Sequence, residues 1–229
     1  LTSCRSAIVR PSAKAKSLRL QQQWAGSARG GASVDPVSRL KELMPTSFKK
    51  HLPRKPEHFF GTMHYQRHNS RRLEHLASLE LPLASRRVLE VGAGIGDHTS
   101  FFLDRGCEVT ITEARQDNLK LLRRRYPNIE VMHLDLDEPK PLNRTWDIAY
   151  CYGVLYHLRN PGSALHFLSK HADLLLLETC VTPGNEVELN PVDEHRESPT
   201  QAISGVGCRP TRRWVQETLG LHFRYVYST

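Results

Sequence analysis

Short apolar runs alternate with longer amphipathic stretches along most of this 229-residue chain. The apolar runs predict β-strands, because short apolar segments bounded by turn residues are typical of strands buried on both faces. The predicted strands cover residues 87–91, 108–112, 130–134, 146–152, 174–177 and 223–227. Stretches with helical periodicity precede and separate them, at residues 64–79, 97–105, 116–126, 161–172 and 211–219.

Strands and helices that alternate at this spacing predict an α/β fold with a doubly wound, mostly parallel sheet. Helix-ending residues support the boundaries, since Gly106, Pro127 and Gly220 each follow a predicted helix. Ligands of such sheets bind at the carboxyl ends of the strands. The polar stretch 186–207 is long enough to be functional, and we expect it to cover the site.

The first predicted strand ends in a glycine turn, in which Glu90 is followed by Gly92, Gly94 and Gly96. Glycines let a ligand lie against bare main chain and permit dihedral angles closed to other residues. The turn lacks the Gly-x-Gly-x-x-Gly spacing of dinucleotide sites. Glu90 would repel a pyrophosphate but suits an ammonium group. The nucleoside S-adenosylmethionine, with an amino-acid end and no phosphate, fits both features.

Acidic residues follow the next two predicted strands. Glu113 comes about 20 residues after the turn, where nucleotide-binding sheets place an acid for the ribose hydroxyls. Asp135 follows the strand 130–134. The glycine turn, these two acids and the segment 146–157 resemble, in their order, the motifs of the class I S-adenosylmethionine-dependent methyltransferases. The resemblance extends from about residue 57 to the end of the chain.

This resemblance implies a Rossmann-like methyltransferase fold and S-adenosyl-L-methionine as the cofactor. It assigns the cofactor site to residues at the strand ends, namely Glu90, Gly92, Ala93, Gly94, Gly96, Glu113, Ala114, Asp135, Leu136, Tyr152 and Gly153. Asp137 is the alternative to Asp135, which is favoured because it lies nearer the strand end. The family adds a final antiparallel strand for which the sequence has no candidate after residue 227, so we expect the sheet to lack it.

A sulfonium methyl group is already activated, so the protein must mainly align the acceptor and exclude water. A base is needed only when the acceptor must lose a proton. His157, just past the strand 146–152, is the first catalytic candidate because its unperturbed pKa lies near neutrality. Its alternative role is to fix the turn by hydrogen bonds. Tyr156 is the second catalytic candidate. Its alternative roles are to form a wall of the cofactor or acceptor site, or only to pack against neighbouring side chains.

The segment 153–161 is similar to the tRNA wobble-uridine carboxymethyltransferases and also to bacterial methyltransferases of small molecules and sugars. The first group uses a carboxylated cofactor, for which Arg159 and Tyr156 could supply the arginine and tyrosine that the resemblance requires. We favour methyl transfer to a small-molecule or glycan acceptor, at an oxygen. A tRNA-modifying (carboxy)methyltransferase and a non-catalytic cofactor-binding module stay open as alternatives.

Positive charge is concentrated near the N-terminus. The net charge is +8, yet no acid precedes Asp35, and residues 57–229 alone are slightly acidic. Charge therefore gives little support for nucleic-acid binding by the domain. We expect a disordered basic arm at 1–35, a helical lead-in at 36–85 and the cofactor-binding domain at 86–229. For the arm, a flexible or artefactual extension, a transit peptide and an arm contacting RNA or membrane are the alternatives.

Five cysteines without a Cys-x-x-Cys pair predict free thiols in a reducing compartment. The twelve histidines are scattered, so no metal site is expected. No apolar run is long enough to span a bilayer, and we expect a cytoplasmic protein without a membrane partner. The chain begins with Leu1 rather than methionine, which indicates a fragment. The sequence leaves the oligomeric state open.

Overall fold

The computed structural model describes residues 6–10 and 55–228. The chain divides into two compact units, Leu1–Ser12 with Pro56–Thr229, and Ala13–Lys55. The architecture described below is that of the first unit. Most of the predicted basic arm and the first part of the predicted helical lead-in lie outside the described residues.

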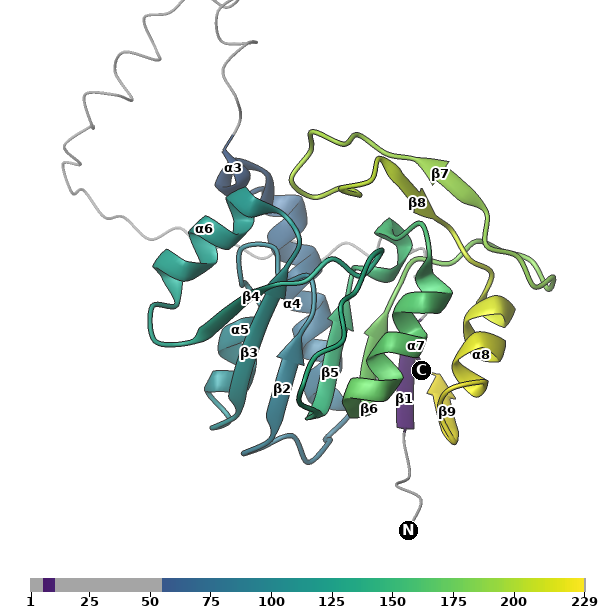
Figure 1. The fold of residues 1–229 in the computed structure, drawn as a ribbon, viewed down its shortest axis with the longest axis horizontal. Coiled ribbons are helices and arrows are strands. Elements are labelled where there is room, and N and C mark those ends of the chain that lie inside the picture. Colours follow the sequence, from purple (N-terminus) through teal and green to yellow (C-terminus); the bar gives the residue numbers. More distant parts are fainter. Residues whose placement is uncertain (1–5, 11–54, 229) are drawn as a thin grey trace, which may run out of the picture. The chain divides into compact units, whose positions relative to one another are not determined.

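A seven-stranded sheet organises the first unit, with the strand order β4-β3-β2-β5-β6-β1-β9 and parallel pairing between all neighbours (Figure 1). Its strands are β1 (Ser6–Arg10), β2 (Arg87–Glu90), β3 (Glu108–Glu113), β4 (Glu130–His133), β5 (Trp146–Tyr152), β6 (Ala172–Glu178) and β9 (Tyr225–Ser228). Because all pairs are parallel, the strands have their carboxyl ends at one edge of the sheet.

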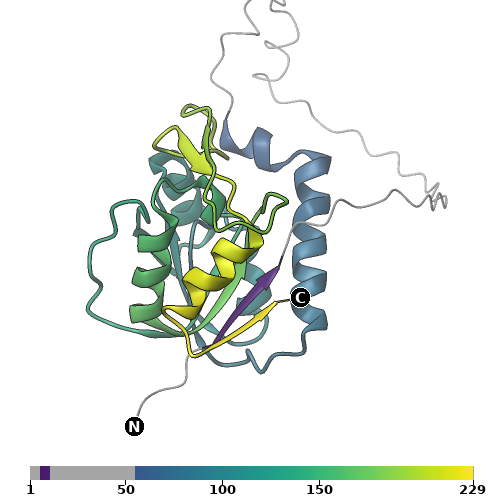
Figure 2. The same cartoon turned by 90° about the vertical axis from the view of Figure 1, so that its right-hand side faces the viewer.

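Helices cover both faces of this sheet, as the doubly wound fold requires. Figure 2 shows α4 on one side of the sheet and α7 and α8 on the other. The described helices are α3 (Pro56–Phe60), α4 (Met63–Ser78), α5 (Thr99–Leu103), α6 (Gln116–Arg125), α7 (Pro161–His171), α8 (Arg212–Gly220) and the 3-10 helix η1 (Leu155–His157). The side chains of Thr62 and Thr211 cap α4 and α8 by accepting hydrogen bonds from backbone amides.

The core has two parts because successive side chains of a strand point to opposite faces. In β5, Ile148 and Tyr150 pack into one cluster with Phe102, whereas Ala149 and Cys151 pack into the other. The first cluster also contains side chains of α4, α5 and α6, and the second contains side chains of α7 and α8. This double burial explains why the central strands are almost continuously apolar in sequence.

The strand between β6 and β9 comes from the N-terminal region. The backbone of β1 pairs in parallel with β6 on one side and with β9 on the other. As expected, the described sheet contains no antiparallel strand at this place. The prediction of disorder through residue 35 is wrong for Ser6–Arg10, because two open strand edges supply backbone partners to a short segment of high β-propensity.

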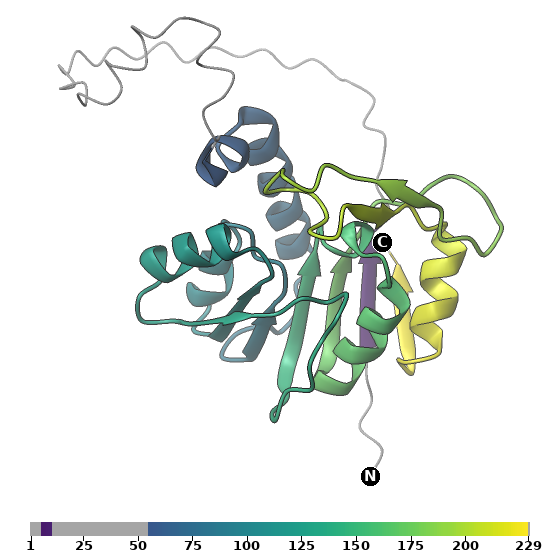
Figure 3. The same ribbon diagram turned by 45° about the horizontal axis from the view of Figure 1, so that its top comes forward.

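The stretch predicted as a polar loop contains a small antiparallel pair, β7 (Pro191–Asp193) and β8 (Val206–Cys208). We call residues 186–208 the cap. Figure 3 shows the cap beyond the carboxyl ends of β5 and β6. The expectation that this stretch covers the site is therefore met, although its strands were not predicted.

The other predicted elements agree with the structure to within a few residues. The main departure is α5, which begins at Thr99 rather than at residue 97 because the turn after β2 continues to His98. The described cysteines, Cys107, Cys151, Cys180 and Cys208, are free thiols. Among the helices of the described residues, none combines the length and the apolar character that crossing a bilayer requires.

Candidate functional site

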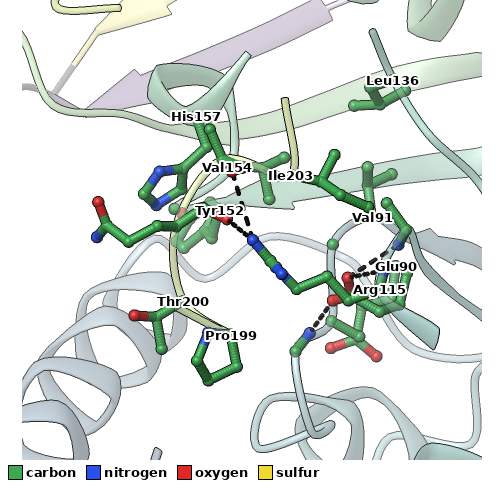
Figure 4. A pocket seen from close by; sticks show the side chains of 18 of the residues that line it. Glu90, Val91, Arg115, Leu136, Tyr152, Val154, His157, Pro199, Thr200 and Ile203 are labelled. Carbon is green, nitrogen blue, oxygen red and sulfur yellow. Dashed lines mark hydrogen bonds between the residues drawn. The ribbon is translucent and has the colours of Figure 1, made fainter. Parts of the chain in front are cut away.

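The carboxyl ends of β2, β3, β4 and β5 surround one pocket, part of which is drawn in Figure 4. Its lining includes both catalytic candidates and nearly all residues predicted to hold the cofactor. These are Glu90, Gly92, Ala93, Gly94, Glu113, Ala114, Asp135, Leu136, Tyr152, Gly153, Tyr156 and His157. Residues far apart in sequence meet here because parallel strands end at the same edge.

The glycine turn lets neighbouring groups approach the backbone closely. Gly92 and Gly94 have positive φ values of 61° and 60°, a conformation that side chains disfavour. A Cβ atom at Gly92 would lie 2.5 Å from Cγ2 of Val154, and one at Gly94 would lie 2.7 Å from Cε1 of Phe60. A side chain at Gly92 would therefore collide with Val154, and one at Gly94 with Phe60.

Gly96, the third glycine of the turn, contacts the end of α6. It is not among the residues that line the pocket. A Cβ atom there would lie 2.6 Å from Cε2 of Tyr126 and 2.9 Å from Cδ2 of Leu122. The hydroxyl of Tyr126 also donates to the carbonyl oxygen of Gly96, at 2.7 Å. Gly96 thus lets α6 pack against the turn, and its contact with the cofactor stays a prediction.

Glu90 is a buried carboxyl group at the end of β2, with 1% of its surface exposed. The hydroxyl of Thr99 donates to it at 2.6 Å. Burial raises the pKa of Glu90 to about 7, although the hydrogen bond from Thr99 works in the opposite direction. A cation bound beside this group would favour its ionised form.

Glu113 connects the glycine turn to the end of β3. Its Oε2 accepts a hydrogen bond from the amide of Gly94, and its Oε1 accepts from the amides of Ala114 and Arg115, each at 2.8 Å. Burial raises the pKa of Glu113, and the three backbone donors oppose that rise. The carboxylate therefore holds both the glycine turn and the turn that follows β3 in place.

His157 is held by Glu194, an acid of the cap that the sequence did not indicate. His157 Nδ1 lies 2.5 Å from Glu194 Oε2, and the Glu194 side chain is only 2% exposed. Burial would raise the pKa of Glu194, but hydrogen bonds from His157 and from the amide of Ala202, and the charge of Arg209, lower it overall. An ionised carboxylate only accepts, so Nδ1 carries the proton and Nε2 is left as the acceptor of the neutral ring.

Tyr156 lies beside the same histidine, with 4.2 Å between the two ring centres. Burial raises the pKa of the Tyr156 hydroxyl to about 12, although the charge of Arg72 lowers it. At neutral pH this hydroxyl keeps its proton. Tyr156 can therefore donate a hydrogen bond in the pocket but does not serve as a base there.

Both acids after β4 line the pocket. Asp135 Oδ1 accepts from the amide of Asp137 at 2.9 Å, which closes a local turn. Asp137 Oδ1 accepts from the amides of Arg159 and Asn160, and its buried Oδ2 has no partner. The structure thus brings both candidates to the site and leaves one oxygen of Asp137 free to accept.

A polar group on α4 and the turn after β2 forms another part of the pocket, and the sequence did not indicate it. Arg72 is buried and donates to Glu178 at 2.7 Å, while its Nε has no partner. Asn69, three residues earlier, points its amide nitrogen toward Asp97 and leaves Oδ1 without a partner.

His98 belongs to the same group. Its Nδ1 lies 2.9 Å from the hydroxyl of Tyr150, and its Nε2 has no partner. Burial lowers the pKa of His98 to about 3, and the charge of Arg72 acts in the same direction, so the ring is neutral. Three buried polar atoms without partners in one part of a pocket are costly unless a ligand binds them.

Arg115 follows Glu113 by two residues and also lines the pocket. Figure 4 shows its side chain reaching across the pocket toward the segment that carries Thr200 and Ile203. Its guanidinium donates to three carbonyl oxygens of the cap. No sequence pattern predicts such contacts, because they join residues more than 80 positions apart.

A family model described as a methyltransferase domain matches residues 63–214. The match covers more than half of the chain, and the chain belongs to this family. The tRNA U34 carboxymethyltransferase of Hahella chejuensis is 29% identical over 145 residues, which are 59% of this chain and 44% of that protein. The one from Mannheimia succiniciproducens is 32% identical over 124 residues, 50% of this chain and 37% of that protein. The chain spans less than half the length of these relatives.

Solved structures share the fold. The N-terminal domain of EvdMO1, determined in the presence of SAH and D-fucose, superimposes with a TM-score of 0.53 at 22% identity, covering 59% of this chain and 65% of that chain. Magnesium protoporphyrin IX methyltransferase from Synechocystis PCC 6803, with bound SAM, gives 0.51 at 14% identity, covering 84% and 88%. The predicted Rossmann-like methyltransferase fold is confirmed.

The raised pKa of Glu90 predicts a pH dependence of stability. The carboxyl group has a pKa of about 7 when folded and an ordinary value near 4.3 when unfolded. Because the folded state binds this proton more tightly than the unfolded state, the contribution of Glu90 to the free energy of unfolding is fully present below pH 4. It is lost as the pH rises toward 7. Relative to Glu90→Gln, the natural chain should lose up to about 3 kcal/mol over this range. Urea denaturation of both proteins at several pH values measures the difference, and parallel curves would contradict the prediction.

Proposed function

We propose that this chain is an S-adenosylmethionine-dependent methyltransferase that acts on an oxygen of a small-molecule or glycan acceptor. The observation that supports this function most strongly is the arrangement of His157, whose ring lines the pocket and is oriented by the buried carboxylate of Glu194. A carboxylate that fixes the tautomer of a histidine is a common way to prepare a base.

The pocket suits the nucleoside part of the cofactor. Glu113 lies at the end of β3, where an acid can accept hydrogen bonds from ribose hydroxyls. Gly92 and Gly94 line the pocket, where their backbone can contact a ligand directly. For the exocyclic amine of adenine we now prefer Asp137, the alternative to Asp135 in the sequence analysis, because its buried Oδ2 has no partner.

The polar group of Asn69, Arg72 and His98 suits the amino-acid end of the same cofactor. A carboxylate needs a cation and donors, which Arg72 supplies beside its pair with Glu178. An ammonium group needs acceptors, which Asn69 Oδ1 and Glu90 supply. The unpartnered buried atoms are therefore consistent with this ligand.

The reaction needs little from the protein beyond alignment and proton removal. The bound sulfonium supplies an activated methyl group. The chain's own residues hold the acceptor oxygen in line with it and exclude water, and the cap is placed to do the latter. The proton of an acceptor hydroxyl passes to Nε2 of His157, while Glu194 stabilises the charged ring.

The charges around the cap favour a small acceptor. Arg209 points inward and pairs with Glu194, and Arg213 pairs with Glu217. Arg196 donates from Nε to the carbonyl of Ile203. These three arginines make ion pairs or hydrogen bonds within the chain, which makes them less available for the phosphate contacts on which RNA binding depends.

A tRNA-modifying (carboxy)methyltransferase is the second candidate. The observation in its favour is the 29% and 32% identity to tRNA U34 carboxymethyltransferases. Those proteins extend well beyond the matched region, so residues that bind tRNA in them need not have counterparts here. In this second function, Arg159 and Tyr156 would supply the arginine and tyrosine for the carboxylated cofactor, and Tyr156 lines the pocket.

A comparison of acceptors tests the proposed function. The chain is incubated with S-adenosylmethionine or with its carboxylated form, each labelled on the group that is transferred, and with either pooled small hydroxylated compounds and glycans or bulk tRNA. We expect label in the first pool. Label in tRNA alone would replace the proposal by its alternative. Binding of SAH without transfer to either pool would favour a non-catalytic module.

Substitution of the histidine separates catalysis from cofactor binding. His157→Asn should lower kcat by about 10²- to 10⁴-fold, the usual contribution of a general base, and should leave the Kd of SAH unchanged. Glu194→Gln should lower kcat by a smaller factor, because the ring remains but is less well oriented. Stopped assays and calorimetry provide the two readouts. A normal rate in His157→Asn would leave this residue only a role in fixing the turn.

The polar group of α4 can be tested with two ligands that differ only at the amino-acid end. Arg72→Lys retains a cation beside Glu178 but loses the Nε donor. We expect it to weaken SAH binding by about 10-fold, the value of one charge-assisted hydrogen bond, and to leave 5′-methylthioadenosine binding unchanged. Calorimetry with both ligands measures the ratio. An equal loss for both ligands would indicate a structural role for Arg72.

A further inference from the structure

A single guanidinium nitrogen of Arg115 makes hydrogen bonds to several backbone carbonyls of the cap. Its Nη2 lies 2.7 Å from the carbonyl oxygen of Arg196, 3.0 Å from that of Gln201 and 3.3 Å from that of Ala202. Arginine suits this task because its guanidinium offers several donors in a fixed plane and no acceptor. The side chain thereby joins β3 to a loop that lies far away in sequence.

The other end of Arg115 is fixed by the acid at the end of β3. The Arg115 amide donates to Glu113 Oε1 at 2.8 Å, while Glu113 Oε2 accepts from the amide of Gly94. The backbone from which the guanidinium extends is therefore anchored, through Glu113, to the glycine turn.

Ala202 connects this arrangement to the candidate base. Its carbonyl oxygen accepts from Arg115, and its amide donates to Glu194 Oε2 at 2.7 Å. The same carboxylate oxygen lies 2.5 Å from His157 Nδ1. A continuous series of hydrogen bonds thus runs from Arg115 through one cap residue to the histidine ring.

Other hydrogen bonds of this turn come from within the cap. The amide of Gly205 donates to the carbonyl of Ala202 at 3.1 Å, and Arg196 Nε donates to the carbonyl of Ile203 at 3.1 Å. Such bonds shape the turn but do not tie it to the sheet.

From outside the cap, Asn118 donates to the carbonyl of Pro199 at 3.4 Å, which is long for such a bond. A segment with few hydrogen bonds to the rest of the fold opens locally at a lower free-energy cost than the core. Without the guanidinium, we expect Ala202 to leave its place more often and Glu194 to lose one of its donors.

We propose that Arg115 is a positioning residue for methyl transfer. By holding Ala202 it keeps Glu194 in place, and Glu194 keeps the His157 ring in the orientation in which Nε2 faces the pocket. This inference rests on the proposed role of His157 as the base. Arg115 takes no proton itself and acts through the cap.

The test uses the full chain and three variants. Arg115→Met removes all donors while keeping much of the side-chain length. Arg115→Lys keeps the charge but not the planar donors. Arg124→Met is the matched control, because Arg124 is an exposed arginine of the neighbouring helix α6. Thermal melting shows whether each variant folds, and Arg115→Lys serves if Arg115→Met does not.

Two measurements in the absence of acceptor report on the proposed chain of contacts. Hydrogen exchange should be at least about 10-fold faster at the Ala202 amide in Arg115→Met, as expected for a freed segment, with no change at the core residue Leu176. The low-field proton resonance of His157 Nδ1, assigned by its loss in His157→Asn, should broaden or disappear. For both the exchange rate and the resonance, Arg115→Lys should lie between Arg115→Met and the unmutated chain, and Arg124→Met should match the unmutated chain.

Kinetics with the acceptor found in the screen complete the test. Arg115→Met should lower kcat by about 10-fold, comparable to the loss of an orienting second contact, with little change in the Kd of SAH. Unchanged exchange at Ala202 and an unchanged His157 resonance in Arg115→Met would overturn the proposal. A normal rate in His157→Asn would instead overturn the role of the base, so the two failures are distinguishable.

Discussion

The carboxylate of Glu113 is the contact on which the rest of the site depends. Its two oxygens bind the amide of Gly94 and the amides that follow β3, so it fixes the glycine turn against the neighbouring strand. From that fixed point Arg115 extends to the cap, and the cap carries Glu194 to His157. If Glu113 were lost, the shape of the turn and the reach of Arg115 would change together.

The buried charged groups of the pocket are not fully compensated by partners within the chain. A buried carboxyl group is costly, and the pKa of Glu90, raised to about 7 by burial, shows that its single hydrogen bond does not offset that cost. Arg72 donates from Nη2 to Glu178, but its buried Nε has no hydrogen-bond partner. Such groups are retained at ligand sites because a bound ion or dipole completes them.

The fold could be predicted from the sequence to the extent that its signals are local. Apolar runs and helix-ending residues located the strands from β2 to β6, and the acids predicted at strand ends line one pocket. The segment Ser6–Arg10 and the three-residue strands of the cap were missed. They are short, and pairing with distant strands, not their own periodicity, makes them strands. The packing of Gly96 against Tyr126, thirty positions away, was likewise not visible in the sequence.

The same distinction explains why the sequence indicates a cofactor more clearly than an acceptor. The cofactor side of the pocket is built from strand ends, where spacing along the chain translates directly into position. The rest of the lining, which includes Tyr156, His157 and residues of the cap, reaches the pocket through tertiary contacts. Glu194 lies in a polar stretch where nothing local separates it from other exposed acids. Its importance follows from burial at 2% exposure against a histidine 37 positions earlier. In the proposed function, the residues beside the acceptor are therefore set by how the cap docks on the sheet, and that docking leaves no local signal in the sequence.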